Sequence, residues 1–157
     1  MQKWGIPILS AAVGALTFAM FFGIKSKKLI WCTIGGALTW AVYLISLELG
    51  LMDAGAYALG AAAGTLYAEI LARVVKTPVS MFALTSLIPM VPGGALYYTM
   101  LGLLRGDKEA FVEKAFYTLT AAGSMAMGMF AATMLFRIIM LCILFIAGKI
   151  LSLMNRE

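Results

Sequence analysis

The chain has 157 residues, of which 63% are hydrophobic and only 12% are charged, and its mean hydropathy is +0.99. This composition is too apolar for an ordinary soluble domain, and it argues against a nucleic-acid partner in spite of a net charge of +5. The charged residues separate long apolar runs, which predicts an all-α membrane protein. We expect about five transmembrane helices in one domain covering residues 1–157.

The predicted spans are separated by short charged segments. Spans one to four cover about residues 4–24, 29–49, 54–75 and 79–104, and a fifth lies within 119–150. This last stretch exceeds the ~20 residues of one crossing but is short for two, so we expect one long or tilted helix. Residues 111–117 are either its extension or an interfacial helix. The first apolar run ends in basic residues rather than a small-residue cleavage site, which predicts a retained span.

Basic residues set the expected orientation, because they are enriched in cytoplasmic loops. Five spans would place one group on the cytoplasmic side, namely Lys25, Lys27, Lys28, Arg73, Lys76, Lys149 and Arg156. The other side would receive Lys3, Arg105, Lys108 and Lys114. We therefore expect a multi-pass membrane protein with its N-terminus outside and its C-terminus in the cytoplasm.

The third predicted span carries a stripe of small residues and a stripe of polar ones. The small stripe consists of Ala56, Gly60, Gly64 and Ala68. Small residues at four-residue spacing let helix backbones approach closely, so we expect this span to be central. Thr65, Glu69 and Arg73 form the polar stripe.

Ionisable residues inside membrane spans are functional candidates. Glu69 and Arg73 have the spacing of an intrahelical ion pair, and Glu69 is the best candidate for a proton relay in a chain without histidine. The alternative is an interfacial salt bridge. Arg137 either lies deep in the fifth span, where Glu69 or a substrate carboxylate would pair with it, or anchors the span at a membrane surface.

The fourth predicted span contains a helix-breaking sequence, Pro89-Met90-Val91-Pro92-Gly93-Gly94. Each proline lacks an N–H and crowds the carbonyl one turn earlier. We expect Pro89 to free the carbonyl of Thr85 and Pro92 that of Ile88. Broken backbone at membrane depth survives only where protein or a watery cavity covers it, and in transporters it often marks the substrate site.

The residues after the break suggest what such a site would bind. Gly93 and Gly94 would open a new half-helix whose free N–H groups and positive dipole end suit a carboxylate. Tyr97 and Tyr98 would supply hydroxyl groups about one turn further on. The alternative is a purely structural kink.

Other chemistry has little support in the sequence. Cys32 and Cys142 both lie in apolar runs, and no Cys-x-x-Cys pair or histidine accompanies them. The chain shows no paired catalytic carboxylates, nucleophile elbow or phosphate-binding loop. We therefore expect no cofactor, no metal site and no enzymatic activity.

Two of these segments resemble the threonine/serine exporter (ThrE) family, specifically its short, YjjB-like subunit. They are Ala68-Glu69-Ile70-Leu71-Ala72-Arg73, and Ile88 to Gly94 with the following Tyr97. The resemblance covers roughly residues 10–132 and implies an exporter of small carboxylate metabolites in the bacterial inner membrane, driven by the proton-motive force. It implies threonine and serine as substrates, or dicarboxylates such as succinate, and a larger ThrE-type (YjjP-like) membrane subunit as partner. A homo-oligomer, a channel-like pore and a non-transporting scaffold remain alternatives.

Overall fold

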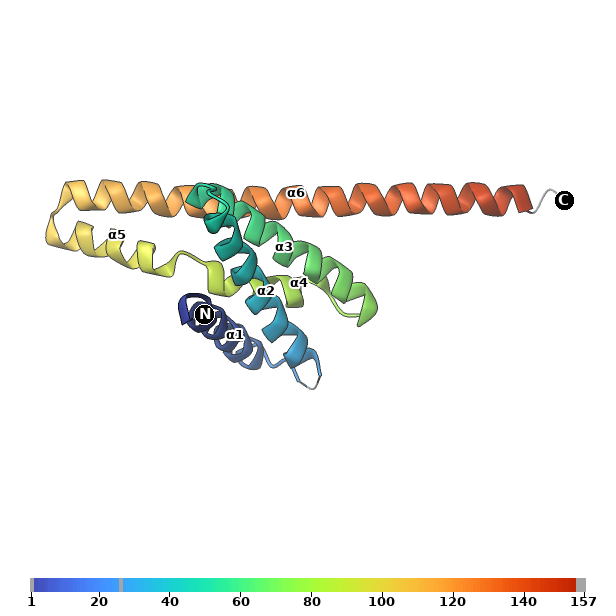
Figure 1. Ribbon diagram of the computed structural model, residues 1–157, viewed down its shortest axis with the longest axis horizontal. Coiled ribbons are helices and arrows are strands. Elements are labelled where there is room, and N and C mark those ends of the chain that lie inside the picture. The colour runs from blue at the N-terminus through green and yellow to red at the C-terminus, as the bar shows by residue number, and fades with distance from the viewer. Residues whose placement is uncertain (1, 26, 155–157) are drawn as a thin grey trace.

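The computed structural model describes residues 2–25 and 27–154, and within these ranges it contains helices and connecting turns but no strand. The prediction of an all-α fold is confirmed (Figure 1). Its elements are α1 (Gln2–Phe21), α2 (Lys28–Glu48), α3 (Asp53–Val74), α4 (Val79–Leu87), the 3₁₀ helix η1 (Ile88–Met90), α5 (Gly93–Arg105) and α6 (Lys108–Met154). Arg156, used above for orientation, lies outside the described residues, as do the side chains of Lys3 and Lys149.

Three of these helices, α1, α2 and α6, are long and apolar enough to cross a membrane. The bent pair formed by α4–η1 and α5 would make a fourth crossing. Helix α3, with 22 residues, matches the third predicted span in length, but it is rich in alanine and glycine and includes Asp53, Glu69 and Arg73. Its lower hydropathy explains why the structure contains three or four clear spans where the sequence predicts about five.

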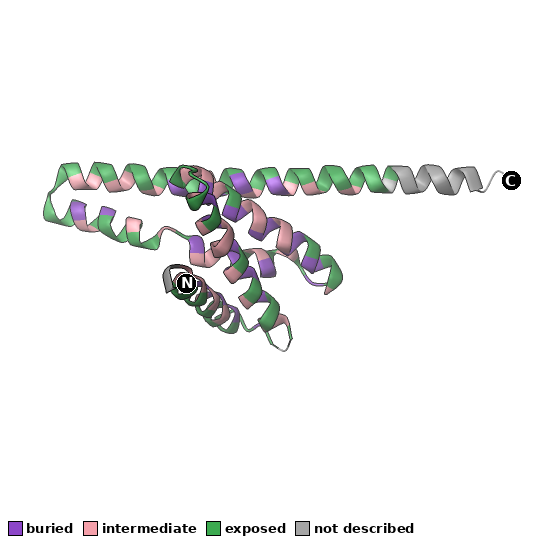
Figure 2. Cartoon of the chain, viewed as in Figure 1, coloured by how far each residue is buried: buried purple, intermediate pink, exposed green. Residues whose placement is uncertain are grey.

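Helix α3 lies at the centre of the packing because its small residues admit close neighbours. Ala56 and Ala68 are fully buried, and the Cβ of an alanine at Gly60 would lie 2.8 Å from the Met90 Cε. An alanine Cβ at Gly64 would lie 2.6 Å from the Thr39 hydroxyl oxygen. The small stripe therefore lies in the buried contacts of α3 with α2 and η1. Figure 2 shows buried segments, in purple, along α3.

Helix α6 is a single helix of 47 residues, roughly 70 Å long at 1.5 Å per residue. The prediction of one long helix over this region is therefore confirmed, and residues 111–117 are its extension. It crosses α3 near its middle, and its C-terminal end extends past the other helices (Figure 1). Its first turns run beside α5, while its C-terminal part carries exposed apolar side chains such as Leu141 and Ile143.

A tight turn at Gly106 joins α5 to α6. Gly106 has a φ of 71°, a left-handed conformation that glycine adopts without steric cost. The N–H of Asp107 donates to the Gly102 carbonyl at 3.0 Å, and the Asp107 carboxylate accepts from the Ala110 N–H at 3.0 Å. These bonds end α5 and begin α6, so α6 runs back along α5.

Candidate functional site

The helix break of the fourth span is present and is built around Pro89. Helix α4 ends at Leu87, a 3₁₀ turn follows, and the axis bends by 55° before α5. Pro89 has no N–H that could donate to the Thr85 carbonyl. Among the described hydrogen bonds, no other backbone N–H donates to that carbonyl. Thr85 is fully buried, and its hydroxyl donates to the Met81 carbonyl at 3.0 Å.

The turn after Pro89 differs in one detail from the expected geometry. The carbonyl of Ile88, which Pro92 was expected to free, accepts a hydrogen bond from the Val91 N–H at 3.1 Å. The chain then turns so that the Gly93 N–H donates to the Val91 carbonyl at 2.7 Å. These turn bonds therefore satisfy the Ile88 carbonyl and the Gly93 N–H, whereas the Thr85 carbonyl has no described backbone donor.

The start of α5 nevertheless leaves backbone donors open. The Leu96 N–H bonds to the Pro92 carbonyl at 3.0 Å, but no hydrogen bond is described for the N–H groups of Gly94 and Ala95. An added Cβ at Gly93 or Gly94 would meet no atom within 4 Å. Free N–H groups at an open helix start are able to bind an anion, since the helix dipole adds to their positive charge.

Tyr97 and Tyr98 lie on the outer surface of α5. They are 62% and 57% exposed, and their rings meet edge to face at 5.4 Å between centroids. The opposite face of the helix packs on α6, where the hydroxyls of Thr99 and Thr118 lie 3.4 Å apart. The two glycines and the two tyrosines therefore share one open surface, which this chain does not enclose.

A groove lies on the other side of the break, between α1, α2 and η1. It has a volume of about 190 Å³ and is lined by residues that include Ser10, Ala11, Trp40, Ile88 and Pro89. The Trp40 indole N–H is buried and has no acceptor in the described part of the chain. Sequence reasoning missed this groove, because its walls come from helices far apart in the sequence.

Glu69 and Arg73 form an ion pair, with the Arg73 Nη1 2.6 Å from the Glu69 Oε2. The glutamate side chain is only 10% exposed, whereas that of the arginine is 44% exposed. The Arg73 guanidinium also lies 4.3 Å from the centroid of the Phe136 ring in α6. The polar stripe of α3 thus contacts α6 through a cation–π interaction.

Arg137 is exposed on α6 and has no ion pair within the described residues. Its neighbour Phe136 contacts Arg73, so Arg137 lies near the end of the bundle where α3 ends. The partner of Glu69 is Arg73, not Arg137.

A second polar cluster, which sequence reasoning did not identify, lies at the opposite end of α3. The Asp53 carboxylate accepts hydrogen bonds from the hydroxyls of Tyr43, at 3.3 Å, and Tyr117, at 3.0 Å. The ring of Tyr43 packs 4.8 Å from that of Tyr57. No local pattern in the sequence indicates this cluster, since Tyr117 is 64 residues away from Asp53. We refer to Asp53, Tyr43, Tyr57 and Tyr117 as the tyrosine–aspartate cluster.

Comparison with known proteins adds one match. A family model described as "Threonine/Serine exporter, ThrE" matches residues 7–135. The matched range contains the small stripe, the helix break and both polar clusters, and it stops two residues before Arg137. No solved structure matches the chain.

Proposed function

This chain belongs to the threonine/serine exporter (ThrE) family, and from that premise we propose that it is a subunit of a secondary exporter in the bacterial inner membrane. The proposed substrates are threonine and serine, with succinate or another dicarboxylate as the alternative. The family supports the exporter role and a membrane location, and the apolar helices agree with both.

The observation that carries a carboxylate substrate is the open start of α5. Gly94 and Ala95 present N–H groups without acceptors at a broken span, and Gly93 and Gly94 leave open space beside them. A bare donor in hydrocarbon costs several kcal/mol, on the order of 2–7, which a bound carboxylate would offset. We assign the substrate carboxylate to the open helix start at Gly93 and Gly94, where the free N–H groups of Gly94 and Ala95 would bind it and Tyr97 or Tyr98 would orient the substrate.

The exposed residues at the start of α5 also suggest that a partner subunit covers this surface. Gly93, Gly94, Tyr97 and Tyr98 are all exposed, and transporters commonly bind substrate between two units that each bring a broken helix. We propose that a larger ThrE-type membrane subunit covers this surface. A second copy of the chain is the alternative.

The proposed orientation places the N-terminus outside and the C-terminus in the cytoplasm. Lys25 and Lys28 flank the turn between α1 and α2, and Arg73 and Lys76 lie where α3 ends. The Arg73–Phe136 contact places Arg137 near the same end. Basic residues gathered at one end support a cytoplasmic location for it.

The test of function is counterflow of radiolabelled threonine, serine and succinate in proteoliposomes. The chain is reconstituted alone and together with the larger subunit. Saturable counterflow that needs both chains would support the two-subunit exporter and identify its substrate. Counterflow by the chain alone would favour the homo-oligomer. No counterflow of any of the three by folded protein would contradict the proposal and favour a scaffold.

The test of the site is a leucine at Gly93 or Gly94. Because open space surrounds both positions, either variant should insert and fold normally but lose counterflow, since the side chain would cover the free N–H groups. Gly123→Leu is the matched control, because Gly123 also has no neighbour within 4 Å but lies in α6. Normal counterflow by both Gly93→Leu and Gly94→Leu would exclude the site.

A further inference from the structure

The exporter proposed above needs a carboxylate that binds and releases a proton, and Glu69 is poorly placed for this. Its carboxylate is held by Arg73 at 2.6 Å, and the arginine is fixed in turn by Phe136. A proton could bind Glu69 only if this charge-assisted contact were lost. The ion pair therefore favours a structural role for Glu69.

Asp53 has the opposite environment. It is exposed at the end of α3, and it has no cationic partner among the described residues. The groups facing it are neutral phenols from α2 and α6, namely Tyr43 and Tyr117. Nearby charges are engaged elsewhere: Glu48 accepts from the Trp4 indole at 2.8 Å, and Lys114 pairs with Glu113 at 2.6 Å.

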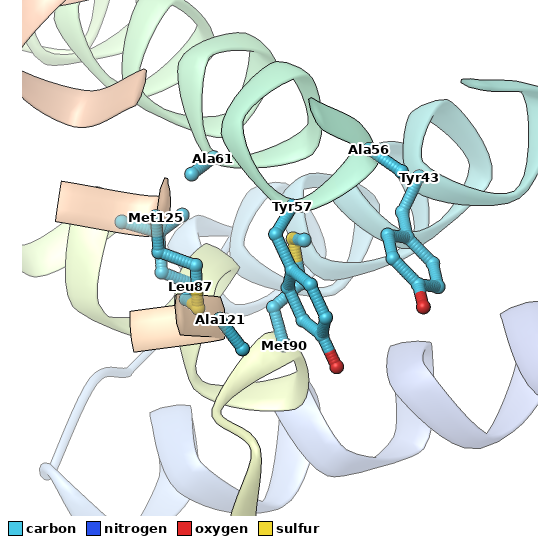
Figure 3. Packing of buried hydrophobic residues seen from close by; sticks show 8 residues of the cluster. All are labelled: Tyr43, Ala56, Tyr57, Ala61, Leu87, Met90, Ala121 and Met125. Atoms are coloured by element: carbon cyan, nitrogen blue, oxygen red, sulfur yellow. The ribbon is translucent and has the colours of Figure 1, made fainter. Parts of the chain in front are cut away.

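The tyrosine–aspartate cluster is also connected to the helix break. Tyr43 and Tyr57 lie in the same buried cluster as Met90 of η1 and as Ala121 and Met125 of α6 (Figure 3). Figure 3 shows the rings of Tyr43 and Tyr57 with their hydroxyls directed to the same side. A change in the hydrogen bonds of Asp53 would therefore act on side chains that contact the break.

We propose that Asp53 is the proton-carrying carboxylate of this exporter, an inference that rests on the proposed function. A proton from water binds one Asp53 carboxylate oxygen, so that an anion and a proton give a neutral acid, and the reverse step releases the proton. No other bond changes. The neutral acid is a weaker acceptor than the anion, so protonation loosens the hydrogen bonds that join Tyr117 of α6 to α3. Proton binding is thereby linked to movement of α6 beside the break.

The experiment compares two modes of transport by the complete exporter in proteoliposomes. Counterflow needs no proton transfer, whereas uphill transport driven by a pH gradient does. Asp53→Asn should retain counterflow but lose gradient-driven transport to the level of protein-free liposomes. Glu69→Gln and the matched control Glu48→Gln, a second exposed carboxylate that accepts from an aromatic donor, should retain both modes.

A double variant tests whether the two phenols couple proton binding at Asp53 to α6. Tyr43→Phe with Tyr117→Phe removes both phenol donors and keeps the carboxylate, so it should retain counterflow but lose gradient-driven transport, because protonation of Asp53 would no longer change a contact with α6. Gradient-driven transport by Asp53→Asn, its selective loss in Glu69→Gln, or its retention in the double variant would overturn the assignment. If Asp53→Asn does not fold, Asp53→Ser, which also suits a helix start, replaces it, and the double variant still tests the assignment alone. Absence of counterflow by the wild type would instead contradict the proposed function.

Discussion

Gly128 of α6 lies directly against the backbone of Ala58 in α3, so closely that a Cβ at position 128 would overlap the Ala58 carbonyl. This contact lies near the middle of α6 and allows the two helices to cross without a side chain between them. A rigid carbonyl is unable to move aside as the end of a flexible side chain does. The crossing therefore depends on a hydrogen atom at this position.

The first prediction concerns this crossing. Gly128→Ala should lower the stability of the detergent-solubilised protein by about 1–3 kcal/mol, the usual cost of overpacking. Gly123→Ala in the same helix meets no atom within 4 Å and should be neutral or stabilising, by up to about 1 kcal/mol, because alanine favours helix. Thermal unfolding followed by fluorescence-detected size exclusion measures both. Equal stability of the two variants would contradict the packing described here.

The second prediction concerns the Glu69–Arg73 pair. Arg73→Gln leaves the glutamate, 10% exposed, without its cation, so it should destabilise the protein. We expect the free energy of unfolding to fall by about 1–2 kcal/mol, less than for a fully buried pair because the arginine is partly exposed. The double variant Glu69→Gln/Arg73→Gln should be more stable than Arg73→Gln, since no unpaired charge remains. Additive losses in the thermal unfolding of Glu69→Gln, Arg73→Gln and the double variant would show that the two side chains act independently.

The third prediction concerns the helix break. Pro89→Ala restores a backbone N–H opposite the free Thr85 carbonyl, so the helix should extend and the 55° bend should decrease. Counterflow should fall strongly while the protein remains folded, because α5 would start in a different place. Pro78→Ala, at the start of α4, is the control and should transport normally. Full activity of Pro89→Ala would show that the bend is dispensable.

The fourth prediction concerns Gly35 of α2. A Cβ at this position would overlap the Ser86 hydroxyl of α4 and lie 2.9 Å from the Tyr67 ring. Gly35→Ala should therefore destabilise the protein by about 1–3 kcal/mol. The Ser86 hydroxyl has no partner in the described structure, so Ser86→Ala should cost little and should partly rescue Gly35→Ala. Unfolding temperatures of the single and double variants provide the test, and the absence of any rescue would contradict it.

Features that depend on local chemistry could be predicted from the sequence. Proline and glycine act on their own turn of helix, so the break at Pro89 and the small stripe around Gly60 and Gly64 could be located without a structure. The four-residue spacing of Glu69 and Arg73 likewise indicates an ion pair within one helix.

Features that depend on tertiary contacts could not be predicted. The hydrogen bond between Asp53 and Tyr117 joins residues 64 positions apart, and no periodic pattern links them. The groove at Trp40 is formed by α1, α2 and η1 together. Whether Tyr97 and Tyr98 face a neighbour or open space depends on the bend and on how α5 packs against α6.

The length of α6 has a mechanical consequence. The helix is held against α3 near Gly128, and Met154 lies 26 residues further on, roughly 39 Å away at 1.5 Å per residue. A rigid helix pivoting by about 10° at that crossing would move its C-terminal end by about 7 Å, given this length. The same rotation would move Cys142, which is closer to the pivot, about half as far, and a spectroscopic label on that exposed residue would report it.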